Sequence, residues 1–188
     1  MALLTRAFFK SPVWTWVVPD EAQRRAVLPL GMRASVDAGL ILDSAYGIGK
    51  PLRGVAIWAP PRMADVDVDP DGTQAGWDAV LAAVGPDGRR RFDSMGEVEK
   101  HRENCIAAEG WYLSLLGVEP EAQRTGVGTA LLRAMWARLD AIRAATYTDT
   151  ENEANVAYYL KHGYALVQQG GLPDNGPPYF CFLRTPPR

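Results

Sequence analysis

The second half of the chain alternates between continuous apolar runs and segments in which apolar residues recur with helical spacing. The run GWYLSLLGVEP, residues 110–120, is mostly apolar and ends at a proline, which is typical of a central strand. From Val127 to Met135 the apolar residues recur at i, i+3, i+4, i+7 and i+8, which predicts a helix with one apolar stripe. The pattern therefore predicts a strand followed by an amphipathic helix.

Three more strands and one more helix are expected after this helix. The strand candidates are residues 144–150, 164–169 and 179–184, and the last two flank a loop of Gly, Pro, Asp and Asn. Between the first two, Thr150 and Glu153 have the spacing of a capping box, and a helix should end at Gly163. The order strand, helix, strand, helix, strand indicates α/β layering with a parallel pair near the centre.

The first half gives weaker patterns. Residues 20–40 have helical spacing, and Pro29 with Gly31 is expected to split them into two pieces. Residues 53–60, RGVAIWAP, form a short apolar run closed by prolines and predict a strand. We further expect a loop and two helical pieces, over residues 62–76, 77–84 and 96–102.

Composition and charge narrow the class of protein. With 188 residues, 47% of them hydrophobic and 22% charged, the chain is long enough for one sizeable core, and we expect a single domain over residues 1–188. A net charge of -2 gives no electrostatic footprint for DNA or RNA, so nucleic acid is not an expected partner.

The cysteines and the N-terminal segment bear on the compartment. Cys105 and Cys181 lack CxxC or CxxH spacing, which favours neither a zinc site nor a disulfide framework. The start MALLTRAFFKSPVWTW lacks the parts of a signal peptide, and no stretch approaches the roughly 20 apolar residues that span a bilayer. We expect a cytoplasmic protein with no metal ion and no membrane partner.

The most informative segment is EPEAQRTGVGTALL, residues 119–132, in which Gly126 and Gly128 stand at the start of the predicted helix. A helix start carries unpaired N–H groups and the positive end of the dipole, and glycines let an anion approach them closely. Gln123 and Arg124 would add a donor and a charge, and Thr129 a hydroxyl. The segment predicts a phosphate-bearing ligand, and a diphosphate would fit several adjacent N–H groups.

Two familiar phosphate loops fit this segment poorly. A P-loop needs a Gly-Lys pair, which does not occur in this chain, and the dinucleotide fingerprint GxGxxG needs a third glycine where Leu131 stands. A nucleotide-binding protein is therefore disfavoured, while a glycine-rich turn without a ligand stays open on spacing alone.

Two motifs in order carry a resemblance to a known family. Segment 115–132 resembles motif A of the GCN5-related N-acetyltransferases (GNAT), Q/R-x-x-G-x-G/A after a strand, and segment 147–167 resembles the next strand and the motif B helix. The matching residues are Gln123, Gly126, Gly128, Asn155, Tyr159, Gly163 and Tyr164. Weaker similarity extends to the branch that contains puromycin acetyltransferase. The resemblance implies an α/β (α+β) GNAT fold, a mixed and mainly antiparallel central sheet flanked by helices, with a splayed parallel strand pair.

The resemblance also implies acetyl-CoA as co-substrate. Its pyrophosphate would lie on the backbone N–H groups of residues 124–129, and its pantetheine arm beside the strand at residues 116–118. Gly117 would suit a bulge in that strand, although a tight packing contact explains it equally well. The implied acetyl-CoA-binding residues are Leu116, Gly117, Val118, Gln123, Arg124, Thr125, Gly126, Val127, Gly128, Thr129, Asn155 and Tyr159.

Within this resemblance Tyr159 is the expected general acid, because Asn155 and Tyr159 lie four residues apart on one helix face. A phenol of ordinary pKa about 10 can protonate a departing thiolate. Core packing is the competing interpretation for Tyr159, and Tyr158 is expected to point elsewhere, into packing or to the surface.

The general base is harder to predict. Relatives often carry a His just before the WYL strand, and Gly110 stands there in this chain. Glu109 is the best candidate, with Glu103 and His101 behind it, and a water relay is equally possible.

The acceptor is expected to be a small-molecule amine. Five of the six tryptophans could line an acceptor pocket or pack in the core: Trp14, Trp16, Trp58, Trp77 and Trp111. A run of aspartates could attract a cationic amine or be simply solvated: Asp65, Asp67, Asp69 and Asp71. The chain is expected to be a monomer or a homodimer. A non-catalytic acyl-CoA-binding sensor remains the alternative to an N-acetyltransferase.

Overall fold

The computed structural model describes residues 1–61, 73–96, 98 and 110–187. The helices are α1 (Ala2–Phe8), α2 (Pro12–Val17), α3 (Glu21–Ile41), α4 (Thr73–Ser94), α6 (Val127–Ala141) and α7 (Val156–Lys161). The strands are β1 (Ala45–Ile48), β2 (Gly54–Ala59), β3 (Trp111–Val118), β4 (Thr146–Thr150), β5 (Ala165–Gly171) and β6 (Pro178–Arg184). Two 3-10 turns, Pro120–Ala122 and Glu153–Asn155, precede α6 and α7.

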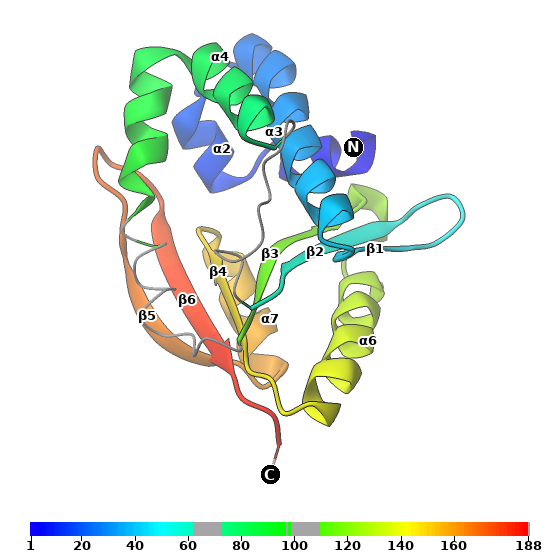
Figure 1. Cartoon of the computed structure of the whole chain (residues 1–188). Coiled ribbons are helices and arrows are strands. Elements are labelled where there is room, and N and C mark those ends of the chain that lie inside the picture. Colours follow the sequence, from blue (N-terminus) through cyan, green and yellow to red (C-terminus); the bar gives the residue numbers. More distant parts are fainter. Residues whose placement is uncertain (62–72, 97, 99–109, 188) are drawn as a thin grey trace.

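Within the described residues, the strands form one twisted sheet of six, in the order β1-β2-β3-β4-β6-β5 (Figure 1). Neighbouring strands are antiparallel except for β3 and β4, which are parallel. The predicted fold class, a mixed and mainly antiparallel sheet with one parallel pair, is therefore confirmed.

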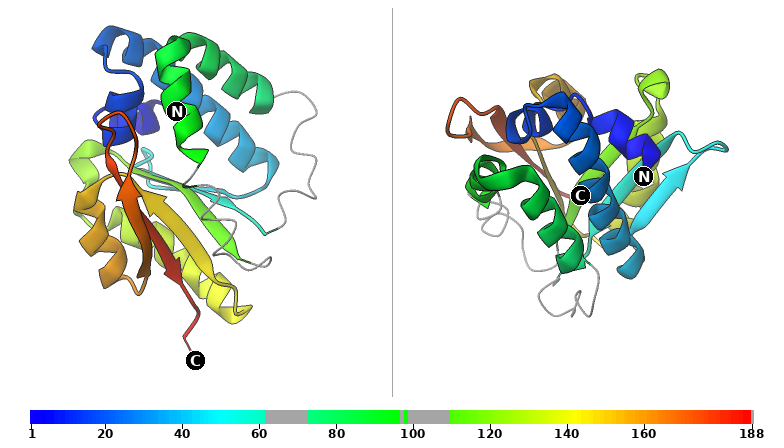
Figure 2. Two further views of the ribbon diagram at one scale, coloured as in Figure 1. Left: turned by 90° about the vertical axis from the view of Figure 1, so that its left-hand side faces the viewer. Right: turned by 90° about the horizontal axis from the view of Figure 1, so that it is seen from above.

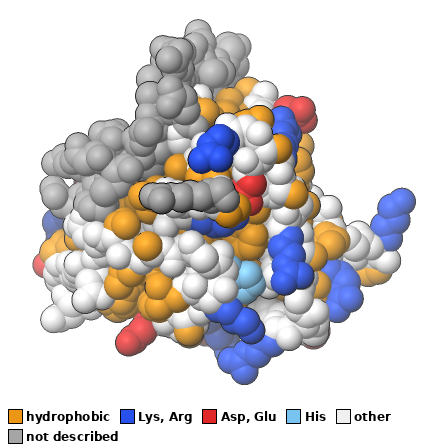
Figure 3. Space-filling model, turned by 90° about the horizontal axis from the view of Figure 1, so that it is seen from below, with side chains coloured by type: hydrophobic (Ala, Val, Ile, Leu, Met, Phe, Trp, Pro, Cys, Tyr) orange, Lys and Arg blue, Asp and Glu red, His pale blue; other side chains and the backbone are white. Residues whose placement is uncertain are grey.

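Helices cover both faces of this sheet (Figure 2). On one face, α1 to α4 pack on β2 and β3 in a cluster around Leu4, Leu28 and Ile57. On the other face, α6 and α7 pack around Trp58, Leu132 and other buried apolar side chains. The surface seen from below mixes apolar side chains with scattered Lys and Arg (Figure 3).

The expected break at Pro29 and Gly31 is wrong, because α3 runs unbroken from Glu21 to Ile41 with Pro29 inside it. A proline inside a helix costs about 3 kcal/mol. That cost is offset by burial, since Val27, Leu28 and Met32 are each at most 3% exposed. Gly31 lets the helix approach Trp14 closely, because a Cβ there would lie 2.8 Å from the indole ring.

The expected capping box of Thr150 and Glu153 is also wrong, because another residue caps this helical segment. Thr150 ends β4, and its Oγ1 accepts a hydrogen bond from the Asn152 N–H at 3.3 Å. The capping residue is Asn152, whose side chain accepts from the Ala154 N–H at 3.1 Å. The predicted end is confirmed, because Gly163 follows α7 with a φ of 82°. The expected helical piece at 77–84 lies within α4. The loop expected at 62–76 is wrong over residues 73–76, which belong to α4, and its residues 62–72 lie outside the described part of the chain, as does most of the helical piece expected at 96–102.

Candidate active site

The parallel strands separate soon after they meet. The register pairs of β3 and β4 are Trp111 with Thr146 and Tyr112 with Tyr147, and none follows among the described residues. Just beyond them, the Thr148 Oγ1 donates a hydrogen bond to the Leu113 carbonyl at 3.1 Å. The facing edges of the two strands then diverge, which opens the centre of the sheet.

A bulge on β3 coincides with this separation. Ile57 on β2 faces Leu115 while Trp58 faces Leu113, so Ser114 is the extra residue, and its side chain is exposed. The bulge is therefore not at Gly117. A Cβ at Gly117 would lie 2.4 Å from Leu4 Cδ2, so this glycine serves a tight packing contact against α1.

The segment that leads into α6 presents its backbone N–H groups outward. Between residues 124 and 129 no N–H group has a hydrogen-bond acceptor in the described chain, and the first that has one is Ala130, which donates to the Gly126 carbonyl at 2.9 Å. Gly126 has a φ of 91° and open space where a Cβ would stand. This row of donors at the positive end of a 15-residue helix suits a diphosphate.

Most polar side chains of this segment donate hydrogen bonds to backbone carbonyls a few residues away. Gln123 Nε2 donates to the Val118 carbonyl at 3.3 Å, and the Thr125 hydroxyl donates to the Ala122 carbonyl at 2.7 Å. Val127 packs on β2, since a Cβ at Gly54 would lie 2.7 Å from its Cγ1. These three residues can therefore offer a ligand their backbone more readily than their side chains.

Arg124 and the neighbouring strand complete the surroundings of the helix start. Arg124 is exposed and adopts a φ of 61°, so its guanidinium remains available to a ligand. A Cβ at Gly128 would lie 3.5 Å from Val118 Cγ2 and 3.7 Å from Leu116 Cδ2. The end of β3 and the start of α6 thus adjoin, as an extended ligand that binds both would require.

Tyr158 and His162 lie against this helix start. The Tyr158 hydroxyl is 3.5 Å from Thr129 Oγ1, and a Cβ at Gly128 would stand 3.3 Å from it. The His162 ring contacts the Tyr158 ring with centroids 4.4 Å apart and the ring planes tilted by 44°. The expectation that Tyr158 points elsewhere is therefore wrong. Its i, i+4 spacing from His162 on a helix next to motif A was a signal in the sequence.

Hydrogen bonds fix the tautomer of His162 and the role of Thr129. His162 Nδ1 lies 2.6 Å from the Tyr158 carbonyl, which can only accept, so Nδ1 carries the proton. Nε2 of the neutral ring then accepts from the Thr129 hydroxyl at 3.1 Å. This hydroxyl, expected to serve a ligand, is engaged within the protein.

Tyr159 lies inside the cluster beneath α7, with its side chain 6% exposed. Its ring is 5.2 Å from that of Phe182. Burial is the main cause that raises the pKa of its hydroxyl well above the ordinary value, while the nearby Thr148 hydroxyl opposes that rise. Tyr159 therefore stays protonated throughout the physiological range, and its hydroxyl is a weaker acid than the ordinary phenol assumed in the sequence analysis. It lies next to Thr148, which bridges β3 and β4 at their separation. Asn155 points to the end of β4, where its Nδ2 donates to Thr150 Oγ1 at 3.1 Å.

An acidic pair that the sequence analysis missed lies at the end of β4. Asp149 alternates with Tyr147 along the strand, so it faces the side covered by α1 to α4. Its Oδ1 accepts a hydrogen bond from the Tyr112 hydroxyl at 2.9 Å. Burial first, and the charge of Asp149 second, raise the pKa of Glu151 to about 7. Two carboxylates spaced i, i+2 at a strand end were the available signal.

Several expected residues lie outside the described part of the chain. They are Glu109, Glu103, His101, Cys105 and the aspartates Asp65, Asp67, Asp69 and Asp71. Of the tryptophans, Trp14 and Trp58 are buried in the two main clusters, and Trp77 and Trp111 pack against them. Trp16 also packs against the core, and it lines a surface hollow as well.

The described ranges contain neither a cluster of metal-ligating side chains nor a membrane-spanning helix. No group of three or more His, Cys, Asp or Glu side chains there could hold a metal ion. No helix in the same ranges is long and apolar enough to cross a membrane.

Comparison with known proteins agrees with this geometry. Residues 93–166 match the family described as acetyltransferase (GNAT) domain. A curated relative, aminoglycoside N(6')-acetyltransferase type 1 of Klebsiella aerogenes, is 35% identical over 99 residues, which are 48% of this chain and 62% of the relative. The chain thus spans less than two thirds of that relative's length. The match to a GNAT acetyltransferase domain covers residues 93–166, and it supports the resemblance carried by the two sequence motifs.

Solved structures share the fold over nearly the whole chain. A histone acetyltransferase HPA2 and related acetyltransferase from Corynebacterium glutamicum aligns with a TM-score of 0.65 at 19% identity, covering 100% of this chain and 89% of that one. The Drosophila melanogaster polyamine N-acetyltransferase, which forms N-acetylagmatine, aligns with a TM-score of 0.57 at 12% identity, covering 98% and 91%. At these identities the likeness concerns the fold.

Proposed function

We propose that this protein transfers an acetyl group from acetyl-CoA to the amine of a small molecule. The observation that carries the proposal is the row of unpaired N–H groups at residues 124–129, placed beside the opening between β3 and β4. A row of donors at a helix start suits a diphosphate, and an opened parallel pair offers strand edges to an extended arm. The match of residues 93–166 to a GNAT acetyltransferase domain supports the same reaction.

Acetyl-CoA would be held by the backbone more than by side chains. The N–H groups from Arg124 to Thr129 would bind the pyrophosphate, and Arg124 would add its charge. The free edge of β3 at residues 116–118 would bind the pantetheine arm. Tyr158 would contact the ligand where its hydroxyl borders Gly128, which adds one residue to the predicted set.

The two faces of the sheet would divide the proton transfers between them. When bound, acetyl-CoA supplies the thioester carbonyl that the amine attacks. On the face of α1 to α4, Glu151 would accept a proton from the amine, because a base with a pKa of about 7 is half deprotonated near neutral pH. Asp149 would hold the ammonium form beside it. On the face of α7, Tyr159 would donate a proton to the departing sulfur.

Glu151 is proposed in addition to Glu109, which keeps its place as the base suggested by the sequence. We also propose that residues 1–188 act as one acetyltransferase unit and that the protein works in the cytoplasm. We further propose that the acceptor is a small-molecule amine, that the protein is a monomer or a homodimer, and that it has no nucleic-acid partner.

Thiol release from acetyl-CoA against a panel of primary amines tests the function. We expect amine-dependent release in the wild type, and a rate at least about tenfold lower in Glu151→Gln if this carboxylate is the base. Glu153→Gln is the matched control, because Glu153 is exposed and only two residues away. Binding of acetyl-CoA without release from any amine would favour the sensor alternative, and an E151Q rate equal to wild type would return the role of base to Glu109 or water.

A further inference from the structure

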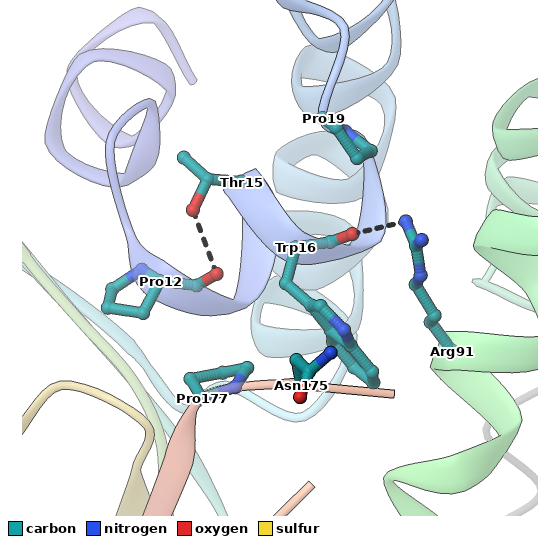
Figure 4. A pocket seen from close by; sticks show the side chains of 7 residues that line it. All are labelled: Pro12, Thr15, Trp16, Pro19, Arg91, Asn175 and Pro177. Carbon is teal, nitrogen blue, oxygen red and sulfur yellow. Dashed lines mark hydrogen bonds between the residues drawn. The ribbon is translucent and has the colours of Figure 1, made fainter. Parts of the chain in front are cut away.

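A hollow of about 410 Å³ lies between α2, α4 and the turn that joins β5 to β6 (Figure 4). Its apolar walls are the Trp16 ring and the prolines Pro12, Pro19 and Pro177, and its polar walls include Arg91 and Asn175. It lies apart from the start of α6 and from Glu151, neither of which lines it.

The hollow concentrates buried hydrogen-bond donors without acceptors. Trp16 Nε1 and Arg91 Nε are both sealed from water and have no hydrogen-bond partner in the described chain. Arg91 Nη1 donates to the Trp16 carbonyl at 2.7 Å, which holds the two side chains at one site. Buried polar atoms in folded proteins are nearly always paired, so two orphan donors on residues that line one hollow call for an acceptor from elsewhere, which reaches them once a covering side chain moves.

The charge of the site points the same way. Arg91 has no carboxylate within 4.0 Å among the described residues, whereas its neighbour Arg90 pairs with Asp87 at 2.9 Å and with Asp174 at 3.5 Å. A partly buried guanidinium without a counter-ion is costly, and a planar carboxylate is its best complement. The flat indole and the prolines suit a flat apolar body attached to that carboxylate.

We propose that this hollow binds a small carboxylate with a flat apolar body, whose oxygens accept hydrogen bonds from Arg91 and Trp16. Asn175 lies beside the Trp16 ring and must turn its side chain aside to admit the ligand (Figure 4). The turn can bear changes there, because Asn175 adopts a φ of 54° that glycine adopts with ease. Asn175→Gly therefore opens the site without straining the turn.

The carboxylate can come from two sources, the acceptor amine itself or a separate effector. The first source rests on the proposed acetyl transfer, and the second does not. The probes are 4-(aminomethyl)benzoate, benzoate and benzylamine, which differ in whether they carry the carboxylate, the amine or both.

The test is a titration followed by the ¹⁵N-indole resonances of the six tryptophans. Both carboxylates should shift the Trp16 resonance, assigned with Trp16→Phe, in a saturable way, and benzylamine should not. Arg91→Gln should weaken benzoate binding about tenfold or more, and Asn175→Gly should strengthen it. Arg89→Gln, which removes an exposed arginine of the same helix, should leave it unchanged. The unshifted tryptophan resonances report whether each variant is folded.

Equal shifts with benzylamine, or benzoate binding that survives R91Q intact, would overturn the proposal. Should the carboxylate belong to the acceptor, 4-(aminomethyl)benzoate would be acetylated with a higher kcat/KM than benzylamine, and R91Q would abolish that advantage. Should it belong to an effector, benzoate would change benzylamine turnover without competing with the amine. Thiol release from neither amine, with the Trp16 shift intact, would count against acetyl transfer and leave the hollow as a carboxylate site.

Discussion

Replacing Glu151 by Gln should make the protein more stable at alkaline pH. The pKa of this side chain is about 7 in the folded protein against an ordinary value of 4.5, because burial and the charge of Asp149 disfavour its ionised form. A carboxyl whose pKa is raised on folding binds its proton more tightly in the native state. The stability that this proton adds is fully present below about pH 4.5 and is lost as the pH rises through about 7.

The size of the effect follows from the shift. A rise from 4.5 to about 7 corresponds to at most about 3 kcal/mol at 1.36 kcal/mol per pKa unit. The side chain is partly exposed and water lowers the cost of its charge, so about 1–2 kcal/mol is the expected effect. Gln carries no charge at any pH. The free energy of unfolding of E151Q minus that of wild type should therefore grow between pH 4.5 and 7 and then level off.

Urea unfolding of both proteins at a series of pH values from 4.5 to 9 measures this difference. E153Q changes the formal charge equally at an exposed position, and its difference from wild type should stay nearly flat. Asp149→Asn should shift the wild-type transition to lower pH, because it removes one cause of the raised pKa of Glu151. A pH-independent difference for E151Q would refute the assignment of Glu151 as a carboxyl poised near neutrality.

Three further predictions address the site and its frame. Gly126→Ala should lower the free energy of unfolding by about 1–2 kcal/mol, since a side chain at a φ of 91° is strained. It should also weaken CoA binding in a calorimetric titration, and an unchanged affinity would contradict the assigned role of this turn. Arg24→Met should lower the free energy of unfolding in urea by about 2–4 kcal/mol, because this buried guanidinium donates to the Phe9, Val18 and Pro19 carbonyls. A loss below about 1 kcal/mol would show that these carbonyls find other partners. In steady-state kinetics, Tyr159→Phe should lower kcat, because it removes the proposed proton donor, and Tyr158→Phe should raise the KM for acetyl-CoA, because it removes a proposed contact with that ligand. A raised KM in Y159F together with a lowered kcat in Y158F would contradict both roles.

The second half of the fold was predictable because its signals are local. The apolar run over β3, the helical spacing of α6 and Gly163 after α7 each depend on a few adjacent residues. The unbroken α3 was not predictable from Pro29, because the burial of Val27, Leu28 and Met32 against distant segments decides the outcome. The first turn of the motif B segment was misassigned because Thr150 and Asn152 compete for the same capping role.

The candidate site was predictable where backbone matters and less so where side chains meet across elements. Gly126 and the N–H groups around it follow from the glycine spacing. The pairing of Tyr158 with Thr129, and the raised pKa of Glu151, depend on how α7 and β4 pack in three dimensions. The bulge at Ser114 depends on the register with β2, which the composition of β3 does not encode.

Calorimetric titration with acetyl-CoA, CoA, ATP and NAD tests the central claim most directly. The account predicts saturable binding of acetyl-CoA and CoA, with an affinity that falls in G126A, and no comparable binding of ATP or NAD. Binding of ATP or NAD without binding of CoA would contradict the account, and would show that the glycine turn before α6 holds a nucleotide instead of the pyrophosphate of acetyl-CoA.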